Sequence, residues 1–328
     1  LNDLDDAFKD FYKKDGGYPK FKKKSASKQS IRLLCGAGIE KLNRKNIMVH
    51  IGKMSFQGLN PERGNEKLFS DGVIFHNVTL SKDNLNNYYA TVCYSFEQLD
   101  QSQVNDKCIG LDMGITDSVT TNEGNFHNLP KSLQIIQSKR KVLQRRFKNK
   151  TKGSRSWKEI KRQIAKLYKK ESNIRKDFHH KLSDKLTKTH GVIVCEDLKI
   201  KNMSKSAKGT IEKPGKMVAQ KSGLNREILN QSWGHFFTLL SYKADQRGGE
   251  VIFVAPQGTS QECSSCGHKD PQSRKGKEFN CSSCRFKIDA DINGAKNILT
   301  RGQRELAGRG TLTQLEPLTP ELETTLLE

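Results

Sequence analysis

The spacing of hydrophobic residues changes along the chain, and each spacing predicts a different kind of element. Intervals of three to four residues predict helices at 1–14 and in a long segment between 131 and 188. Between 31 and 97 the apolar residues instead form short β-branched and aromatic runs separated by turn residues. Two of these runs, 73–80 and 87–96, flank the sequence SKDNLN and predict an antiparallel hairpin.

A second pattern begins at Lys107, where compact apolar runs alternate with helical segments. Three central strands are predicted at 108–112, 192–196 and 250–255. The order of strands and helices between 107 and 302 predicts an α/β domain with a mixed sheet.

Further elements follow from local composition. A hairpin is predicted at 117–129, turning at Glu123 and Gly124, and the long basic helices are expected to divide at 152–154. One helix is predicted at 225–245. The segment 201–223 is rich in Lys, Ser and Gly and predicts a mobile loop.

The charge of the chain is strongly positive and unevenly distributed. Its 58 Lys and Arg exceed its 36 Asp and Glu, giving a net charge of +22 and a pI near 9.6. Between 138 and 188 there are 20 Lys or Arg and four acids, whereas from 303 to 328 two Arg face five Glu. Because binding to phosphates releases counterions, this excess predicts a nucleic-acid partner for the middle of the chain.

Membrane segments and secretory signals are not predicted. No run approaches the roughly 20 apolar residues that cross a bilayer. The acidic first residues lack the pattern of a secretory signal. We therefore expect no membrane partner and a cytoplasmic, nucleoid-associated protein.

Three acids occupy positions suited to metal chemistry. Asp112 and Glu196 each end a predicted central strand, and Asp291 begins the helix that follows the cysteines. Carboxylates that converge at a sheet edge repel one another unless they share protons or bind cations, and Mg²⁺ is the cation that suits them. Each acid also has an ordinary interpretation, as a turn residue, a surface pair with Asp197, or, for Asp289 and Asp291, a helix N-cap.

Four of the eight cysteines form two CxxC pairs separated by 14 residues: Cys263, Cys266, Cys281 and Cys284. This spacing predicts a closed, structural zinc site with four thiolate ligands. A redox dithiol, the alternative, needs only one CxxC pair. His268 lies between the pairs and is not needed as a ligand.

The motifs GLDMGITD at 110–117, VIVCEDL at 192–198 and the cysteine-containing stretch at 259–298 occur in a characteristic order. With GYPKFKKK at 17–24 and RKDFHHKLSDKL at 175–186, they resemble the TnpB family of insertion-sequence proteins and the related miniature type V CRISPR nucleases. Members usually begin with a further strand and helical recognition segment, and the resemblance here starts near residue 7. A second departure is Arg285, where Gly is more typical.

The resemblance implies an α/β RNase H-like (RuvC) nuclease domain with a nested four-Cys zinc ribbon, preceded by a β-rich wedge-like domain that binds RNA. The corresponding divisions are the end of a helical recognition segment with a basic linker at 1–30, the wedge-like domain at 31–106, the nuclease core at 107–260, the zinc ribbon at 261–287, the third acidic motif at 288–302 and a disordered tail at 303–328.

The resemblance also implies the chemistry. The catalytic acids would be Asp112, Glu196 and Asp291, holding two Mg²⁺ ions; Asp291 is preferred to Asp289 because the family uses the second acid of this pair. The partners would be a guide RNA derived from the chain's own element and target double-stranded DNA, with sequence recognised by base pairing.

Candidate nucleic-acid contacts in the basic helices are Arg140, Arg145, Arg146 and Lys148. Phe147 and Trp157 could stack on bases but are expected to pack within the protein. Two alternative functions remain: a binding protein that acts without cleavage, and a guide-free transposase or junction nuclease. The first would lack at least one acid, and the second would cut without RNA.

Overall fold

The computed structural model describes residues 2–13, 16–20, 29–33, 37–41, 46–51, 54–59, 72–95 and 106–309. The chain forms two compact units, residues 1–99 and 100–328, which are described separately. None of the helices in the described ranges is both long and apolar enough to cross a membrane.

The described residues of the first unit form one helix and two small antiparallel sheets, with Val49 and Val78 buried in the core. Its elements are α1 (Asn2–Tyr12), β1 (Gln29–Leu33), β2 (Ala37–Lys41), β3 (Asn46–Ile51), β4 (Met54–Leu59), β5 (Ile74–Lys82) and β6 (Tyr88–Ser95). The predicted hairpin is confirmed by the antiparallel pairing of β5 and β6. The Asp83 carboxylate accepts hydrogen bonds from the backbone N–H groups of Leu85 and Asn87, and these bonds fix the turn between the strands.

A five-stranded mixed sheet forms the centre of the second unit, in the order β11-β10-β7-β8-β9. The strands are β7 (Cys108–Asp112), β8 (Val119–Thr121), β9 (Phe126–His127), β10 (Val192–Glu196) and β11 (Glu250–Val254). β7, β10 and β11 are parallel, whereas β8 and β9 add the predicted hairpin in antiparallel orientation. The predicted mixed sheet is thus confirmed.

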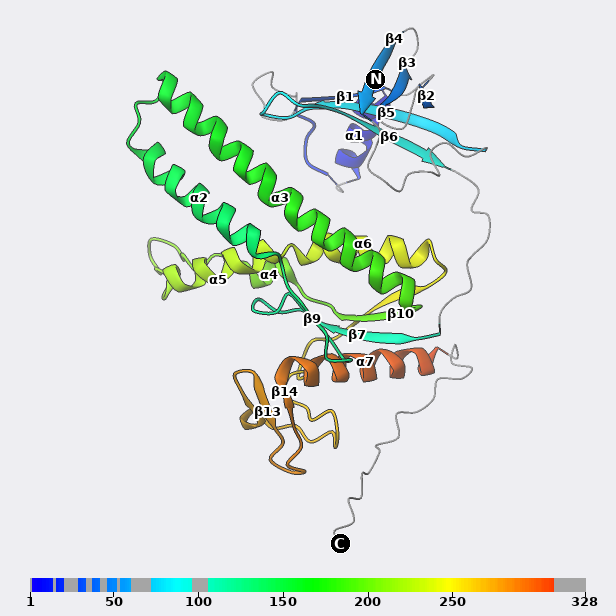
Figure 1. Ribbon diagram of the computed structural model, residues 1–328, viewed down its shortest axis with the longest axis vertical. Helices are drawn as coiled ribbons and strands as arrows, with labels where there is room; N and C mark the ends of the chain where they lie inside the picture. Colours follow the sequence, from blue (N-terminus) through cyan, green and yellow to red (C-terminus); the bar gives the residue numbers. More distant parts are fainter. Residues whose placement is uncertain are drawn as a thin grey trace. The chain divides into compact units, whose positions relative to one another are not determined.

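Helices cover both faces of this sheet (Figure 1). They are α2 (Lys131–Lys148), α3 (Arg155–Thr189), α4 (Ile200–Met203), α5 (Val218–Gln231), α6 (Trp233–Asp245) and α7 (Ala290–Gly308). Ile109, Leu111 and Ile193 pack in one cluster with side chains of α3 and α6, whereas Val194 packs with α7 on the opposite face. The predicted break between the basic helices is confirmed, because the Ser154 side chain caps α3.

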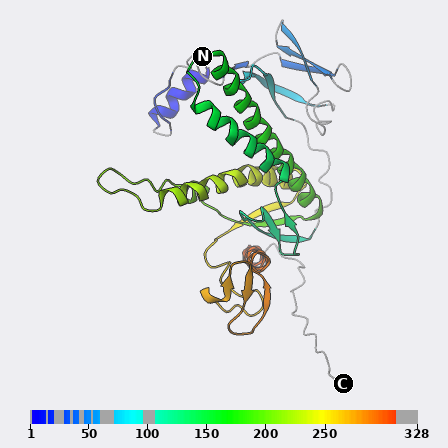
Figure 2. The same ribbon diagram turned by 60° about the vertical axis from the view of Figure 1, so that its left-hand side comes forward.

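The four cysteines lie in turns beside a small three-stranded antiparallel sheet. This sheet lies next to α7 (Figure 2). The strands of the sheet are β12 (Arg274–Lys275), β13 (Glu278–Asn280) and β14 (Lys287–Asp289), and the 3₁₀ turn η2 (Pro271–Ser273) precedes them. Phe279 is buried between the cysteines and Ala290, at the start of α7. The four cysteines together with this sheet, called the cysteine module below, are therefore packed directly against the helix that carries the third acid, Asp291.

Three predictions about local structure are wrong in part. The predicted loop 201–223 overlaps α4 and the start of α5, which Lys221 ties together by donating to the Met203 carbonyl at 2.6 Å. The predicted single helix at 225–245 is broken at Ser232, whose φ of 54° is incompatible with a continuous α-helix.

The third partly wrong prediction concerns the tail. Helix α7 continues past 302 to Gly308, because Leu306 extends its apolar stripe and is buried against the sheet. The remainder of the predicted tail, 310–328, lies outside the described residues.

Candidate active site

A cavity of about 260 Å³ lies at the end of the central sheet and is lined by all three predicted acids. The other lining residues are Met113, Gly114, Pro256, Thr259, Ser260, Arg274 and Gly294. A larger cavity of about 470 Å³ lies between α2 and α3, but the residues that line it include no acid. The smaller cavity is therefore the candidate site for metal-dependent chemistry.

The alternation of side chains along a strand places two of the acids on one face of the sheet. Asp112 and Glu196 end β7 and β10, which are parallel neighbours. Leu111 and Cys195 face α3 and α6, so the next residue in each strand faces α7. Asp291 lies in the first turn of α7 and completes the set.

Close packing of α7 on β7 depends on two glycines. A Cβ atom at Gly110 would lie 2.3 Å from the carbonyl oxygen of Ala295, and one at Gly294 would lie 3.1 Å from Oδ2 of Asp112. A larger residue at Gly110 would push the helix away from the sheet, and one at Gly294 would crowd the Asp112 carboxylate. The glycines therefore allow the helix that carries Asp291 to approach Asp112.

Two neighbouring acids at the start of α7 have different roles. The Asp289 side chain accepts hydrogen bonds from the backbone N–H groups of Asp291 and Ile292, so it is the helix N-cap. Asp291 instead lines the cavity and pairs with Arg274 at 2.9 Å. This arrangement agrees with the preference for Asp291 over Asp289 as a site residue.

Burial destabilises the charged forms of two of these carboxylates, Asp112 and Glu196. The pKa of Asp112 is raised from 3.8 to about 7; burial is the largest cause, the charges of Glu196 and Asp291 add to the rise, and the charge of Arg274 opposes it. Burial also raises the pKa of Glu196, with the Thr259 hydrogen bond as the largest opposing cause. Such a site favours a bound cation, which would restore the ionised forms.

Sequence reasoning missed two side chains of this site, Arg274 and Thr259. Arg274 extends from the cysteine module to Asp291, and the Thr259 hydroxyl donates to Oε1 of Glu196 at 2.5 Å. Both residues lie within the 259–298 stretch that carries the family resemblance. Their place within this stretch was visible in the sequence, but their contacts with acids on other elements were not.

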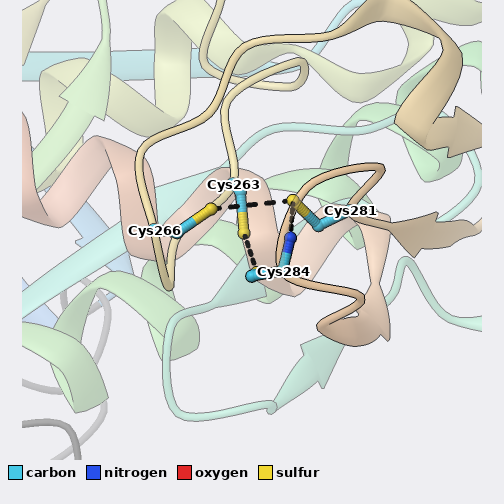
Figure 3. A group of neighbouring side chains, drawn as sticks. All are labelled: Cys263, Cys266, Cys281 and Cys284. Carbon is cyan, nitrogen blue, oxygen red and sulfur yellow. Dashed lines mark hydrogen bonds between the residues drawn. The ribbon is translucent and has the colours of Figure 1, made fainter.

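The four cysteines form a compact group (Figure 3). Their sulfur atoms all lie within 4.8 Å of one another, with separations of 3.7 Å for Cys263–Cys284 and 3.6 Å for Cys266–Cys281. A zinc tetrahedron with Zn–S bonds of about 2.3 Å has edges of roughly 3.8 Å, so the group fits zinc. A backbone N–H of Cys284 donates to Cys281 and lowers its pKa, which favours the thiolate.

The carboxylates are spaced differently from the cysteines. Among the residues that the structure describes, the cysteines are the one group of three or more possible ligands within 4.8 Å of each other. Asp112, Glu196 and Asp291 surround their cavity at wider spacing. One ion bound by all three carboxylates at once therefore fits poorly.

The four basic candidates on α2 fall into two groups. Arg145, Arg146 and Lys148 are exposed. The Arg140 side chain instead pairs at 2.6 Å with Glu171 of α3, which is almost fully buried. The prediction that Arg140 contacts nucleic acid is therefore not supported by this conformation, because its charge compensates a buried carboxylate.

Two aromatic residues near the turn between these helices pack together as expected. The ring centroids of Phe147 and Trp157 are 5.1 Å apart, and Lys161 lies over the Trp157 ring. These contacts occupy a face of each ring within the protein. They agree with the interpretation of Phe147 and Trp157 as packing residues.

Two protein-family models and several known proteins match most of the chain. The OrfB_IS605 family model, described as "Probable transposase", matches residues 91–207, and the Cas12f1-like TNB domain matches 233–298. The chain is 35% identical to "Putative RNA-guided DNA endonuclease InsQ" of Escherichia coli (strain K12), over 98% of this chain and 77% of that protein. It is 27% identical to "CRISPR-associated endodeoxyribonuclease Cas12f1" of Sulfoacidibacillus thermotolerans, over 66% of this chain and 50% of that protein.

A solved structure of a Cas12f1–sgRNA–target DNA complex has a similar fold. Its TM-score is 0.54 at 15% sequence identity, and the match covers 90% of this chain and 69% of that one. Similarity at this level of identity concerns the fold alone. The sequence relationship to InsQ extends over nearly the whole chain and includes the segments that carry the acids and the cysteines, and the chain therefore belongs to the TnpB family.

Proposed function

We propose that the chain is an RNA-guided DNA endonuclease of a transposable element, with a RuvC-type RNase H-like core and a β-rich, wedge-like unit that binds RNA. The observation that carries this proposal is the arrangement of Asp112, Glu196 and Asp291 around one cavity. The names of two relatives also support it: InsQ is named an RNA-guided DNA endonuclease, and Cas12f1 is named an endodeoxyribonuclease.

The three carboxylates would hold two Mg²⁺ ions. Carboxylate oxygens are preferred Mg²⁺ ligands, and wide spacing of the acids suits two ions about 4 Å apart. Bound Mg²⁺ supplies activation of a water and stabilisation of the leaving oxygen of a phosphodiester. The protein's own contribution is to hold the carboxylates on one face of the sheet and to place the Arg274 guanidinium beside Asp291, where it can also attract a phosphate.

The cysteine module would hold a structural zinc ion. Four thiolates complete a tetrahedron and leave no open position for water, so this ion would take no part in hydrolysis. Its role would be to maintain the small sheet that carries Arg274. Zinc thereby supports the carboxylate site without contacting the substrate.

The basic helices would bind the RNA–DNA duplex. Arg145, Arg146 and Lys148 remain candidates for contacts with phosphates, because they are exposed and near the end of α2. Sequence would be recognised by pairing between guide RNA and target, with the protein binding the backbone and a short flanking DNA motif.

The first experiment is to express the chain with its native flanking DNA and sequence the RNA that copurifies with it. We expect one discrete RNA that maps near the gene and ends in variable flanking sequence, which defines the target for a Mg²⁺ cleavage assay. Random RNA, or none, would contradict guidance by RNA. Cleavage without any RNA would instead favour the guide-free nuclease.

A further inference from the structure

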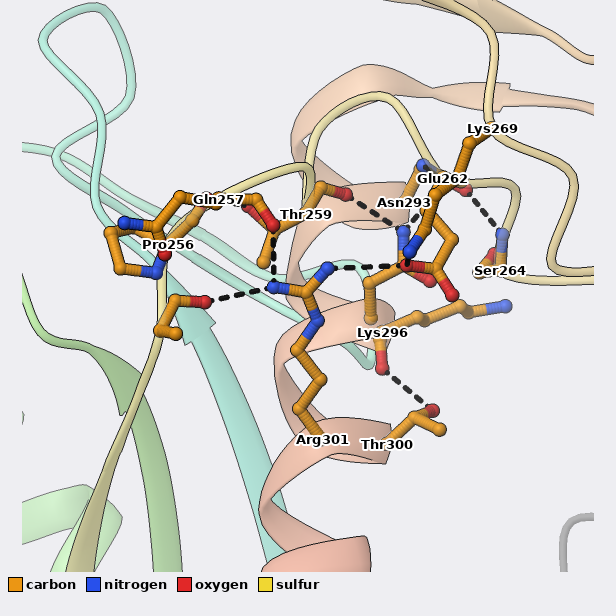
Figure 4. Close-up of polar contacts among 12 residues, drawn as sticks. Pro256, Gln257, Thr259, Glu262, Ser264, Lys269, Asn293, Lys296, Thr300 and Arg301 are labelled. Carbon is orange, nitrogen blue, oxygen red and sulfur yellow. Dashed lines mark hydrogen bonds and ion pairs between the residues drawn. The ribbon is translucent and has the colours of Figure 1, made fainter.

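The loop at 255–262 connects the last strand of the central sheet to the cysteine module and is held by side chains of α7 (Figure 4). Nη1 of Arg301 donates to the carbonyl oxygens of Ala255 and Gln257, both at 2.8 Å. Nη2 of the same guanidinium pairs with the Glu262 carboxylate at 3.1 Å. One arginine therefore fixes the loop near both of its ends.

The middle of the loop is held by the buried side chain of Asn297. Its amide donates to the carbonyl oxygens of Thr259 at 2.8 Å and of Glu262 at 2.6 Å. Asn293, one turn earlier in α7, donates to the same Glu262 oxygen at 2.7 Å. Together with Arg301, these residues set the position of Thr259 relative to α7.

Thr259 connects this loop to the carboxylate site. Its hydroxyl lies 2.5 Å from Oε1 of Glu196 and 3.0 Å from the carbonyl oxygen of Pro256, and the residue is 4% exposed. A hydroxyl has one hydrogen to donate, and a carboxylate is the stronger of these two acceptors. The contact with Glu196 is therefore the dominant interaction of this side chain.

We infer that Thr259 is a positioning residue for the nuclease reaction, which fixes the Glu196 carboxylate for metal binding and is itself set in place by Asn297 and Arg301 of α7. Helix α7 then controls two acids: it carries Asp291 directly and reaches Glu196 through the loop. This inference rests on the proposed function, because it assigns Thr259 a role toward the metal ions that Glu196 would hold.

The test compares two substitutions at Thr259 with a matched control. Thr259→Val keeps the shape of the side chain and removes the hydroxyl, whereas Thr259→Ser keeps the hydroxyl. Thr300→Val is the control, since the Thr300 hydroxyl donates to the Lys296 carbonyl within α7 (Figure 4). Each variant is purified as the full chain with its copurified RNA, and its zinc content and melting temperature are measured.

Thr259→Val is expected to weaken Mg²⁺ binding, measured by calorimetric titration, and to raise the Mg²⁺ concentration for half-maximal DNA cleavage. The expected change in both is about 10- to 100-fold, the usual effect of removing a group that orients a metal ligand. Thr259→Ser should stay within about threefold of the wild type, and Thr300→Val should leave Mg²⁺ binding unchanged. Equal Mg²⁺ binding by Thr259→Val and the wild type would overturn the inference.

The role of α7 is tested separately with Arg301→Met, using Arg304→Met on the exposed side of the helix as its control. We expect Arg301→Met to raise the Mg²⁺ requirement, and the double variant with Thr259→Val to be no worse than the more affected single variant. Additive effects would show that Arg301 does not act through Thr259. Absence of Mg²⁺-dependent cleavage by the wild type would count against the proposed function itself, which distinguishes the two failures.

Discussion

The cysteine module and the carboxylate site are two candidate metal sites in one unit, built in different ways. The cysteines come from a short stretch of chain and lie within 4.8 Å of one another. The acids come from β7, β10 and α7 and surround a cavity at wider spacing, where burial and the charges of Glu196 and Asp291 raise the pKa of Asp112 to about 7. The first site is assembled locally and would support stability once it holds zinc. The second depends on the whole fold, and its burial and repulsion between acids would be relieved by a cation.

The strongest expected effect is that Asp291→Ala lowers DNA cleavage by about a thousandfold or more, because the residue lines the cavity with the other two acids. RNA content and zinc content should remain those of the wild type. Asp289→Ala is the matched control: it removes the N-cap, costs about 1 kcal/mol of stability and should retain cleavage. Full activity of Asp291→Ala in a single-turnover assay would remove this residue from the site.

The cysteine module is tested by Cys281→Ser. We expect zinc, measured by atomic absorption, to be lost and the melting temperature to fall, since metal binding contributes to the folding free energy of such modules. Cleavage should fall as well, because the same small sheet carries Arg274. Cys93 is an exposed cysteine of the other unit, and Cys93→Ser should leave zinc content, melting temperature and cleavage unchanged. Unchanged zinc content in Cys281→Ser would contradict the zinc assignment.

Arg274→Ala tests the connection between the two sites. Loss of the guanidinium removes the ion pair with Asp291, and we expect cleavage to fall by about a hundredfold while zinc content stays unchanged. Lys277→Ala is the control, because Lys277 links the module to Asp117 instead of to an acid of the cavity. Equal losses of cleavage in the two variants would show that Arg274, like Lys277, only holds the cysteine module in place and has no further role toward Asp291.

The smallest expected effect concerns stability without metal. The pKa of Asp112 is raised in the folded protein, so the folded state binds more protons than the unfolded state between about pH 4 and 7, and stability falls as pH rises through this range. Asp112→Asn removes this loss and should stabilise the metal-free protein by about 2 kcal/mol at pH 8. The advantage should vanish near pH 4; its absence in chemical denaturation at pH 8 would contradict the raised pKa of Asp112 in the folded protein.

Local patterns in the sequence predicted local structure well. The CxxC spacing was sufficient to predict the cysteine group, and the β5–β6 hairpin followed from its two runs and turn. Asp112 and Glu196 could be placed near one another because parallel strands end at the same edge of a sheet. In these cases the residues that decide the structure are close in sequence or follow a simple period.

Contacts between distant elements could not be predicted in the same way. The partner of Arg140 is Glu171, 31 residues away on another helix, and the partner of Thr259 is Glu196, 63 residues away. Neither pair has a characteristic spacing, because tertiary packing alone brings them together. Likewise, the left-handed conformation of Ser232 between α5 and α6 has no signal in the sequence, because helices usually tolerate serine.

The most direct test of the central claim is Mg²⁺-dependent cleavage of a DNA duplex that matches the copurified RNA, by the wild type and by Glu196→Ala. The account predicts that the wild type cuts the matched duplex, leaves a mismatched duplex intact, and stops when Mg²⁺ is removed. It also predicts that Glu196→Ala retains the RNA and does not cut. Cleavage by Glu196→Ala at the wild-type rate, or cleavage independent of the match to the RNA, would contradict it.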